Sequence, residues 1–442
     1  SDWSSDVCSS DLAVFAIGAR SAVFAPVNDL GLIIIDEEHE SSYKSGSHPR
    51  YHARQVAMYR SSREGAIMVM GSATPSLEAY HLMKEGKIEE VPLTKRLAGG
   101  KMPALRIVDL KREENSISKV LAEKIDGALA AKKQVILFLN RRGFSYFFHC
   151  RNCGFEMTCS HCSVSLTYHK QHNRMICHYC GYSTAPVSVC PECGSLDVGY
   201  SGFGTEKIEE DISSFFPDAR VARIDTDSVQ KRGALKSILS RFSAGEIDIL
   251  LGTQMVAKGL NFPKVDLVGI VLADTGLSLP DFRAAERTFQ LLQQVSGRAG
   301  RFSEEGEVII QTFRPENNAI QSALTGDLKG FYSGELEMRR ALRFPPFGRL
   351  FRLVFRGRNG EETAAAADRL AEMLVEQLHE AGEVLGPAAC PIGIIAKNHR
   401  YQIIIRTDHF SKTHAVLKHV FNNYAVPSRV YIEIDVDPVS LL

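Results

Sequence analysis

Short apolar runs alternate with polar stretches over the first region of the chain, residues 13–95. Two apolar runs, 30–36 and 66–71, each end in a polar turn. Such runs are typical of parallel strands that are buried on both faces, and the stretch 51–61 between them predicts a helix. We therefore expect part of an α/β sheet in this region.

Residues 96–330 continue the alternation of strand and helix on a larger scale. Two stretches, 205–216 and 284–299, predict helices between strands. This order indicates a doubly wound parallel sheet, so the fold class is α/β. A cysteine-rich block, residues 148–198, interrupts the region. The predicted strands begin at Gln134, Arg220, Ile247, Val265 and Glu307.

The last region, residues 335–442, predicts a small α+β domain. Two strand-like stretches, 349–357 and 401–407, flank an alanine-rich helix over residues 361–380. Arginines alternate with Phe and Leu in the first stretch, which predicts a strand with one basic face. This strand is either a surface for DNA or a partner peptide, or a sheet edge protected by charge.

Composition limits the classes of function. Lys plus Arg and Asp plus Glu number 52 each, so the formal net charge is zero and any nucleic-acid surface must be a local patch. No apolar run is long enough to span a membrane, and no secretory signal is recognisable. Residues 1–12, SDWSSDVCSSDL, lack helical or strand periodicity. We interpret them as a non-native leader and the rest as a fragment of a longer protein.

Eight of the ten cysteines form four Cys-x-x-Cys pairs, which indicates metal binding rather than disulfides. Eight thiolates suffice for two tetrahedral zinc sites with four cysteine ligands each; an iron–sulfur cluster and free thiols are the alternatives. The spacing favours nested sites, although an interleaved arrangement stays open. The inner site would use Cys159, Cys162, Cys177 and Cys180, and the outer site Cys150, Cys153, Cys190 and Cys193.

Glycines and histidines accompany the cysteine pairs. Gly154, Gly181 and Gly194 follow three pairs and permit the tight turn that directs backbone N–H groups at sulfur. We expect the block to have almost no apolar core, so metal binding should supply most of its folding free energy. Chelation should then melt the block and leave the parallel sheet folded. We interpret five histidines as surface groups or as hydrogen-bond partners of the ligands: His149, His161, His169, His172 and His178.

A row of acidic side chains, Asp36, Glu37 and Glu38, followed by His39, comes directly after the apolar run 30–36. Ligands bind beyond the carboxyl ends of parallel strands. An Asp there can hold Mg²⁺, and a neighbouring Glu can orient or deprotonate an attacking water. A solvated acidic loop is the alternative.

Two polar motifs follow other predicted strands. Residues 71–76, GSATPS, supply hydroxyls where a helix can begin, and an ordinary N-cap turn is the alternative. Thr253, Gln254, Lys258 and Gly259 are small or polar groups that can meet a nucleotide or a phosphate backbone.

An amphipathic helix ends in Gln294, Arg298 and Arg301. The two arginines share a helix face and suit bidentate phosphate contact. Alternatively, they interact with the negative end of the helix dipole.

Taken together, these motifs resemble the PriA family of replication-restart helicases, within superfamily 2 of the DNA helicases. Residues 36–60 resemble the family's Walker B motif and the aromatic-rich loop behind it, and residues 71–76 resemble motif III. Further resemblances cover the motifs that open the second lobe and motifs V and VI, at residues 135–144, 202–212, 252–263 and 294–301.

The resemblance implies two RecA-like lobes, the first over residues 13–95 and truncated, the second over residues 96–330. It also implies nested zinc sites, ATP with Mg²⁺ as cofactor, 3′-to-5′ translocation on DNA and reloading of the replicative helicase at stalled forks. The implied partners are branched and single-stranded DNA, single-stranded DNA-binding protein and other primosome proteins. The implied state is a monomer in the bacterial cytoplasm, associated with the nucleoid and without a membrane.

The resemblance also assigns roles to individual residues. Asp36 would coordinate Mg²⁺, Glu37 would position the hydrolytic water, and Arg298 with Arg301 would reach the γ-phosphate. Gln294 would sense the nucleotide. Glu38 and His39 complete the expected catalytic set, and Thr253 and Gly259 the nucleotide contacts. Coupling of ATP state to DNA is expected from Tyr43, Lys44, Arg50, Tyr51, His52 and Lys258, since aromatics stack on bases and basic groups neutralise phosphates; a flexible surface segment is the alternative.

One family motif is missing from the sequence. No glycine-rich phosphate loop of the form G-x-x-x-x-G-K-[ST] occurs, because Gly86-Lys87 and Gly100-Lys101 are followed by Ile and Met. Without the amides and the lysine of that loop, affinity for the β- and γ-phosphates should collapse. We expect the chain alone to hydrolyse ATP poorly or not at all. The alternative function is an inactive, zinc-stabilised DNA-binding fragment.

Overall fold

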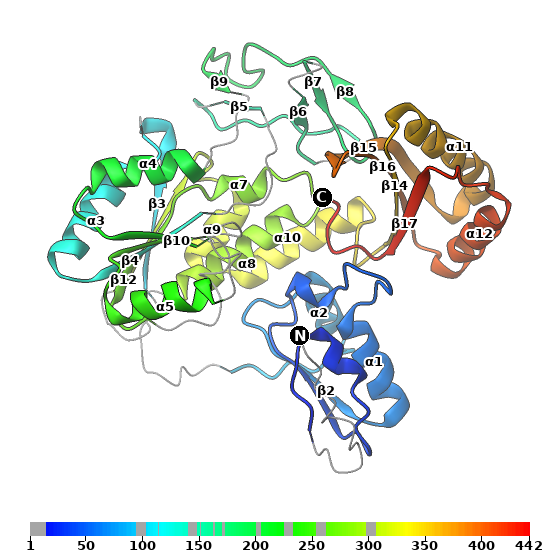
Figure 1. Cartoon of the computed structure of the whole chain (residues 1–442), viewed down its shortest axis with the longest axis horizontal. Helices are drawn as coiled ribbons and strands as arrows, with labels where there is room; N and C mark the ends of the chain where they lie inside the picture. The colour runs from blue at the N-terminus through cyan, green and yellow to red at the C-terminus, as the bar shows by residue number, and fades with distance from the viewer. Residues whose placement is uncertain are drawn as a thin grey trace. The chain divides into compact units, whose positions relative to one another are not determined.

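The chain folds as two compact units in this computed structural model (Figure 1). Unit 1 holds residues 1–90 and the short segment 434–439, and unit 2 holds residues 91–433 and 440–442. The predicted leader, residues 1–12, lies outside the described residues. Those are 15–93, 103–113, 115–139, 148–150, 152–161, 164–169, 173–199, 205–224, 233–252, 262–297 and 306–442. No helix within these ranges has both the length and the apolar character that a membrane crossing requires.

Unit 1 contains two parallel strands, β1 (Leu32–Ile35) and β2 (Ile67–Met70), which confirms their predicted pairing. The prediction that these strands are buried on both faces is wrong, because Leu32, Ile34 and Ile67 are each at least 50% exposed. Within the described part of this unit the sheet has two strands only, and part of its surface stays exposed to solvent. The other elements are η3 (Arg20–Phe24), η4 (Ser41–Tyr43), α1 (Ala53–Glu64) and α2 (Leu77–Lys84).

Unit 2 contains a six-stranded parallel sheet in the order β10-β11-β4-β12-β13-β3. The predicted α/β class and all five predicted strands are confirmed. The sixth, β3, was not predicted, because an arginine interrupts its short apolar run. The strands are β3 (Ala104–Asp109), β4 (Gln134–Phe138), β10 (Val221–Ile224), β11 (Ile249–Gly252), β12 (Val265–Ile270) and β13 (Glu307–Thr312). The helices are η5 (Leu110–Arg112), α3 (Lys119–Ala130), α4 (Thr205–Phe215), α5 (Ala234–Ala244), α7 (Asp274–Leu277), α8 (Ala284–Ser296), α9 (Asn318–Thr325) and α10 (Leu328–Ala341).

Apolar side chains of α3 and α4 form the core of this sheet. Leu121 of α3 and Ile212 of α4 are fully buried in one cluster with strand residues such as Leu137. Gly269 in β12 allows the close approach, since a Cβ there would lie 2.7 Å from Leu137 Cδ2. Burying each such side chain contributes about 1.5–3 kcal/mol, so this cluster holds the helices on the sheet.

α8 and α10 pack through stacked rings and a buried ionic cluster. Phe289 stacks on Phe331 with ring centroids 4.3 Å apart. Arg339 is fully buried, and its Nη2 donates to Glu286 Oε2 at 2.7 Å. Glu335 Oε2 lies 3.9 Å from Arg339 Nε. Burial raises the pKa of Glu335 to about 7, and the charge of Arg339 only partly offsets this.

The cysteine-rich insertion forms two small antiparallel sheets. The prediction that it has almost no apolar core is wrong. Phe148 and Tyr179 of the insertion lie in one buried cluster with Phe282, Phe344 and Ile404 from elsewhere in unit 2. The sequence of the block alone could not reveal this core, because other segments supply part of it. The strands are β5 (His149–Cys150), β6 (Thr167–His169), β7 (Arg174–Ile176), β8 (Ser183–Thr184) and β9 (Val198–Gly199).

Buried polar contacts fix the insertion in place. Arg314, just after β13, lies with its Nη2 3.0 Å from Glu156 Oε1 and its Nε 3.6 Å from Asp274 Oδ1. Burial raises the pKa of Glu156, and the positive charge of Arg314 opposes the rise. On the other side, Gln402 Nε2 donates to the carbonyl of His178 at 2.7 Å. The insertion is therefore part of unit 2 and not a separate, flexible module.

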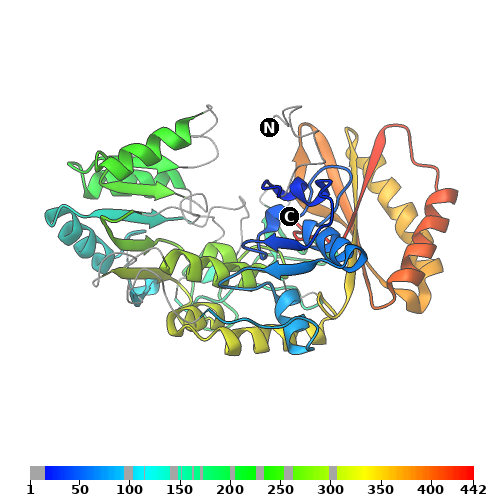
Figure 2. The same cartoon turned by 90° about the horizontal axis from the view of Figure 1, so that it is seen from below.

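The C-terminal region forms a four-stranded sheet in the order β15-β16-β14-β17, and the predicted α+β character is confirmed. Helices α11 and α12 lie on one side of this sheet (Figure 2). The sequence did not predict β15, β17 or α12. The elements are β14 (Arg349–Gly357), α11 (Gly360–Leu378), η6 (His379–Ala381), β15 (Glu383–Ile395), β16 (Asn398–Thr407), α12 (Phe410–Asn423) and β17 (Val430–Val436).

The predicted basic face of β14 does not exist. Arg352 is 7% exposed, and its Nε donates to Gln402 Oε1 at 2.7 Å. Arg356 pairs with Glu433. The alternative, a charge-protected edge, is also wrong, because β14 lies between β16 and β17. The alternation misled the prediction because Arg352 packs against polar groups of the protein itself, while Arg356 stays exposed beside Glu433.

The buried Glu335 makes the stability of unit 2 depend on pH. Its pKa in the fold, about 7, exceeds the ordinary value of 4.5. Between these values the folded chain keeps a proton that the unfolded chain loses, so the free energy of unfolding falls as pH rises through this window. Glu335→Gln should remove this loss. The substitution should therefore change the free energy of unfolding more favourably at pH 8 than near pH 5, by up to about 3 kcal/mol.

The measurement is thermal unfolding by circular dichroism at both pH values. Glu337→Gln, which changes an exposed carboxylate on the same helix, is the matched control and should have little effect. If both variants and the unaltered chain lose stability equally between the two pH values, the buried carboxylate is not the cause.

Candidate functional site

Asp36 and Glu37 lie at the carboxyl end of β1 and are exposed. The backbone N–H of Glu37 donates to Asp36 Oδ1 at 3.0 Å. Glu37 has a φ of +47°, a conformation that costs a non-glycine residue about 1–2 kcal/mol and that is often found at functional sites. The turn thus presents two carboxylates to solvent at the strand end, where a cation or a water can reach them.

Glu38 and His39 point into the protein instead. Glu38 is 3% exposed, and Arg54 Nη1 donates to its Oε2 at 2.7 Å. The backbone N–H of Ser76 donates to Glu38 Oε1 at 2.5 Å. His39 Nδ1 lies 2.7 Å from Ser72 Oγ. Both residues therefore bind the GSATPS segment, and the four residues of the acidic motif divide into two exposed and two engaged side chains.

The GSATPS segment has both of the roles that were considered. Ser76 is the N-cap of α2, and its Oγ accepts from the backbone N–H of Ala79 at 3.2 Å. The same segment is bonded to the acidic turn, because the N–H of Gly71 donates to the carbonyl of Ile35 at 2.8 Å and the carbonyl of Gly71 accepts from the N–H of Glu38 at 3.1 Å. A displacement of one segment would therefore displace the other.

The loop behind the acidic motif is joined to it through Tyr43. The hydroxyl of Tyr43 donates to the carbonyl oxygen of Asp36 at 2.6 Å. Partial burial and the charge of Asp36 raise the pKa of Tyr43, so the donor stays protonated. Tyr51 packs edge-on against Phe24, with ring centroids 4.8 Å apart. His52 caps α1 by accepting from the N–H of Arg54 at 3.3 Å.

The basic residues of this loop are held by carboxylate and carbonyl groups of unit 1. Lys44 is buried, and its Nζ lies 2.8 Å from Asp435 Oδ1. Arg50 Nη1 lies 3.9 Å from Asp435 Oδ2. Arg20 Nη1 donates to the carbonyl of Lys44 at 2.9 Å. The loop is therefore ordered and not the flexible segment considered as an alternative.

Of the remaining residues that were expected to contact the nucleotide or the DNA from the second lobe, the structure describes one. Gln294 lies on α8 and is half-buried. The expected arrangement, with Glu37 opposite Arg301 across a nucleotide, stays a prediction. The residues outside the described ranges are Thr253, Gln254, Lys258, Gly259, Arg298 and Arg301.

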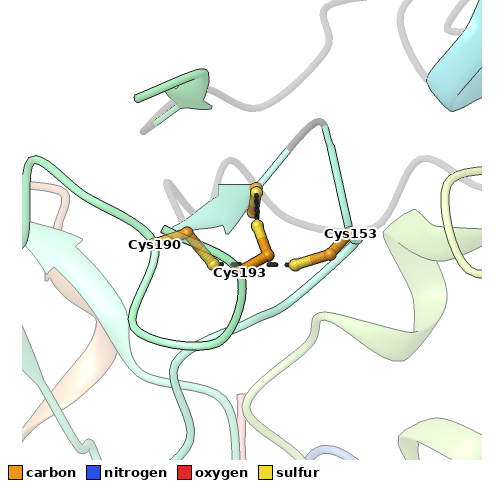
Figure 3. A group of neighbouring side chains, drawn as sticks. Cys153, Cys190 and Cys193 are labelled. Carbon is orange, nitrogen blue, oxygen red and sulfur yellow. Dashed lines mark hydrogen bonds between the residues drawn. The ribbon is translucent and has the colours of Figure 1, made fainter. Parts of the chain in front are cut away.

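Seven cysteines of the insertion form two clusters in nested order. In the outer cluster, Cys150 Sγ lies 3.6 Å from Cys193 Sγ, and Cys153 Sγ lies 3.6 Å from Cys190 Sγ. Figure 3 shows Cys153, Cys190 and Cys193 converging from two loops. The four sulfurs all lie within 4.8 Å of one another. Cys159, Cys177 and Cys180 form the inner cluster, and Cys162 lies outside the described residues.

A repeated turn brings each pair of sulfurs together. In the first turn, the N–H of Cys150 donates to the carbonyl of Phe155, and the N–H of Gly154 donates to the carbonyl of Cys150. The same two bonds recur in the turns that begin at Cys177 and Cys190. As predicted, Gly154, Gly181 and Gly194 have positive φ, between +71° and +77°. A side chain at these positions would strain the turn and misplace the sulfurs.

The outer cluster has the donor set of a site for a divalent metal. Burial raises the pKa of Cys153 to about 12 and that of Cys150 above its ordinary value. A hydrogen bond from Asn152 lowers the pKa of Cys193 to about 6. Four sulfurs at this separation would repel one another as thiolates, and a cation removes that cost. Sulfur ligands in a closed set of four suit tetrahedral Zn²⁺.

Sequence reasoning missed three functional contacts. Arg54 bridges Glu38 and Ser76, Asp435 meets Lys44, and Arg314 anchors Glu156. Each pair is formed by residues at least 16 positions apart. Because no local pattern marks such partners, they carry no signal in the sequence alone.

Comparison with known proteins identifies three matching family models. The helicase conserved C-terminal domain matches residues 204–303. The cysteine-rich region domain of the PriA DNA helicase matches residues 159–184. The C-terminal domain of primosomal protein N matches residues 340–439. These matches reach both the six-stranded sheet and the C-terminal sheet, together with the inner cysteine cluster.

Curated relatives are similar over nearly the whole chain. Replication restart protein PriA of Treponema pallidum (strain Nichols) is 50% identical over 426 residues, which cover 96% of this chain and 65% of the relative. The PriA of Bacillus subtilis (strain 168) is 43% identical over 434 residues, 96% of this chain and 54% of the relative. The PriA of Rickettsia conorii (strain ATCC VR-613 / Malish 7) is 38% identical over 437 residues, 98% of this chain and 67% of the relative.

The chain spans between 54% and 67% of the length of these three relatives. The matches place a cysteine-rich region, a helicase C-terminal domain and a primosomal C-terminal domain in this order along one chain. The chain therefore belongs to the PriA family of replication restart proteins.

Proposed function

We propose that this chain is the C-terminal part of an ATP-dependent DNA helicase that moves 3′ to 5′ and promotes reloading of the replicative helicase at stalled forks. The single observation that carries the proposal is the hydrogen bond from Tyr43 to the carbonyl of Asp36, at 2.6 Å. It joins an aromatic and basic loop, suited to a nucleic-acid strand, to an acidic turn suited to Mg²⁺ and water. A helicase needs such a link between the site that hydrolyses ATP and the surface that binds DNA.

Within this proposal the exposed carboxylates have the chemical roles. Mg²⁺ bound with ATP would supply charge neutralisation of the phosphates. Asp36 would hold the ion and Glu37 would orient the attacking water, because both lie exposed at the strand end. Glu38 and His39 have positioning roles, since Arg54 and Ser72 occupy them.

The other lobe would contribute nucleotide contacts and charge stabilisation. We assign Arg298 and Arg301 to the γ-phosphate, Gln294 to nucleotide sensing and Thr253 with Gly259 to nucleotide contact, as the resemblance implies. Lys258 would join the loop residues in coupling to DNA. Branched DNA, single-stranded DNA-binding protein and other primosome proteins are the proposed partners of the whole protein.

We assign Zn²⁺ to both cysteine clusters, as two sites with four cysteine ligands each. The inner set would be completed by Cys162. The domains of the proposal are the truncated first lobe over residues 13–95, the second lobe over residues 96–330 with its insertion at 148–198, and the C-terminal domain over residues 335–442. For this chain alone, the absent G-x-x-x-x-G-K-[ST] motif favours a second function, zinc-stabilised DNA binding without catalysis.

The chain alone should hydrolyse ATP at a rate close to background, with or without single-stranded DNA. The physical reason is the missing set of phosphate-loop amides and lysine that would hold the β- and γ-phosphates. A phosphate-release assay on the purified chain measures this. Robust hydrolysis that DNA stimulates and Glu37→Gln abolishes would contradict the non-catalytic function of the chain and support a complete motor.

Tyr51→Ala should weaken binding of a fluorescein-labelled oligo(dT) strand at least about fivefold, because an aromatic stacking platform is worth about 1–3 kcal/mol per base. Fluorescence anisotropy gives the affinity. Tyr59→Ala is the matched control, since Tyr59 is 66% exposed on α1 and outside the loop. Equal effects of the two substitutions would remove the loop from the DNA site.

Metal analysis should find about two zinc ions per chain, and Cys193→Ser should lower this to about one. Chelation should increase hydrogen exchange in the insertion and also at its C-terminal neighbours such as Ala389 and Gln402, which contact His178. Strands β4 and β12, in a separate core cluster, should stay protected. Loss of the insertion's protection without any change at its neighbours would contradict the shared core. Cys390→Ser, outside both clusters, should keep two ions.

A further inference from the structure

We propose that Lys44 and Arg50 form a subsite for a phosphate of single-stranded DNA, and that the carboxylate of Asp435 fills this subsite when DNA is absent. Asp435 would thus regulate DNA binding as an intramolecular competitor. The inference rests on the proposed function, because it specifies how the contact between the loop and DNA is controlled.

Lys44 is surrounded by acceptors from one short segment of unit 1, residues 434–439. Its Nζ lies 2.8 Å from Asp435 Oδ1 and donates to the carbonyl of Val436 at 2.6 Å and to that of Asp437 at 3.4 Å. The carbonyls of Val436 and Asp437 accept its hydrogen bonds, and Asp435 faces it as an ion pair. Any DNA phosphate that reaches Lys44 must replace at least one of them.

The geometry around Asp435 is that of an anion held by two cations. One carboxylate oxygen faces Lys44, and the other lies 3.9 Å from Arg50 Nη1, which is beyond hydrogen-bond distance. A DNA phosphate is larger than a carboxylate and likewise presents two anionic oxygens, so one oxygen can face each cation. Lys44 and Arg50 therefore match a phosphate at least as well as they match Asp435.

The subsite is accessible at its edge. The side chains of Asp435 and Arg50 are 16% and 19% exposed, although that of Lys44 is only 6% exposed. An incoming phosphate would meet Arg50 first and reach Lys44 when Asp435 withdraws. Such a step lowers the apparent affinity for DNA by the fraction of molecules in which the subsite is open.

The competitor also has a defined consequence for the acidic motif. Lys44 follows Tyr43 directly, and Tyr43 donates to the carbonyl of Asp36 at 2.6 Å. When Asp435 leaves Lys44, the loop loses this ion pair and keeps only the hydrogen bonds from Lys44 to the carbonyls of Val436 and Asp437, so the DNA strand also determines the position of the loop. The proposed route from the DNA to the acidic motif therefore becomes active only after displacement.

The test measures binding of fluorescein-labelled oligo(dT) to the full chain by anisotropy. Asp435→Asn should tighten binding by about fivefold and make the logarithmic salt dependence steeper by about 0.7, the value for one added phosphate contact on a single strand. Asp437→Asn is the matched control. It removes an equal charge from the same segment, and its side chain accepts a hydrogen bond from Gln55. It should leave affinity nearly unchanged.

A second substitution separates this inference from the proposed function. Lys44→Met should abolish the gain when combined with Asp435→Asn. If Tyr51→Ala and Arg50→Ala weaken binding but Asp435→Asn does not tighten it, the competitor idea is overturned and the DNA loop stands. If Tyr51→Ala, Arg50→Ala and Lys44→Met all leave affinity unchanged, the DNA loop itself is wrong.

Hydrogen exchange on the unaltered chain tests the same idea without relying on a variant that folds. Saturating oligo(dT) should protect loop residues 41–52 and accelerate exchange in residues 434–439, because the segment loses its contact with Lys44. Protection of the loop with unchanged exchange in the segment would show that Asp435 stays in place and would overturn the inference.

Discussion

The burial of carboxylates is the constraint on which much of this structure depends. Glu38 is buried against Arg54, Glu286 against Arg339 and Asp281 against Arg287, with N–O distances between 2.7 and 2.9 Å. Each pair joins residues that are not neighbours in sequence. Replacing a buried pair by apolar groups is often neutral, but removing one partner costs about 3–5 kcal/mol because a charge is left unpaired. The pairs therefore contribute little net stability and much specificity: each carboxylate can be buried only where its arginine lies.

The same constraint explains how four consecutive polar residues acquire different roles. Ionised carboxylates in a row repel one another, and they could not all occupy one pocket. Arg54 forms an ion pair with Glu38, which is therefore buried. The strained, positive φ of Glu37 turns the chain so that the side chains of Asp36 and Glu37 stay in solvent. The turn is fixed at one end by Glu38 and left accessible at the other. A fixed, exposed pair of carboxylates suits the contacts with metal and water that the proposed function assigns to Asp36 and Glu37.

The parts of the fold that the sequence predicts are those with a local pattern. The run at β4 is apolar from Val135 onward because both faces of the sheet are covered, and the Cys-x-x-Cys-Gly spacing determines the turns at the cysteine pairs directly. Predictions failed where the partner is distant in sequence. The prediction of a basic face on β14 was wrong because Arg352 is hydrogen-bonded to Gln402. The prediction that the insertion has almost no apolar core was wrong because Phe282 and Phe344 contribute to that core. In the candidate site, the sequence identifies Asp36 and Glu37 but not Arg54, since nothing local distinguishes a structural arginine from one that meets phosphate.

The balance of charge gives these internal pairs a further significance for nucleic-acid binding. The chain has as many acidic as basic side chains, and two basic residues that a sequence would assign to DNA are buried against internal acceptors: Arg352 with Gln402, and Lys44 with Asp435. A protein that binds DNA through permanently exposed cations carries a large positive field and attracts any polyanion. In the proposed subsite, a phosphate would instead exchange with Asp435 before it gains Lys44. Such an exchange makes affinity depend on geometry, because only a strand that places a phosphate beside Arg50 and a base near Tyr51 can offset the loss of the internal pair. In this proposal, selectivity for a particular DNA shape would require no base-specific contact, because the internal ion pair opposes strands that do not fit.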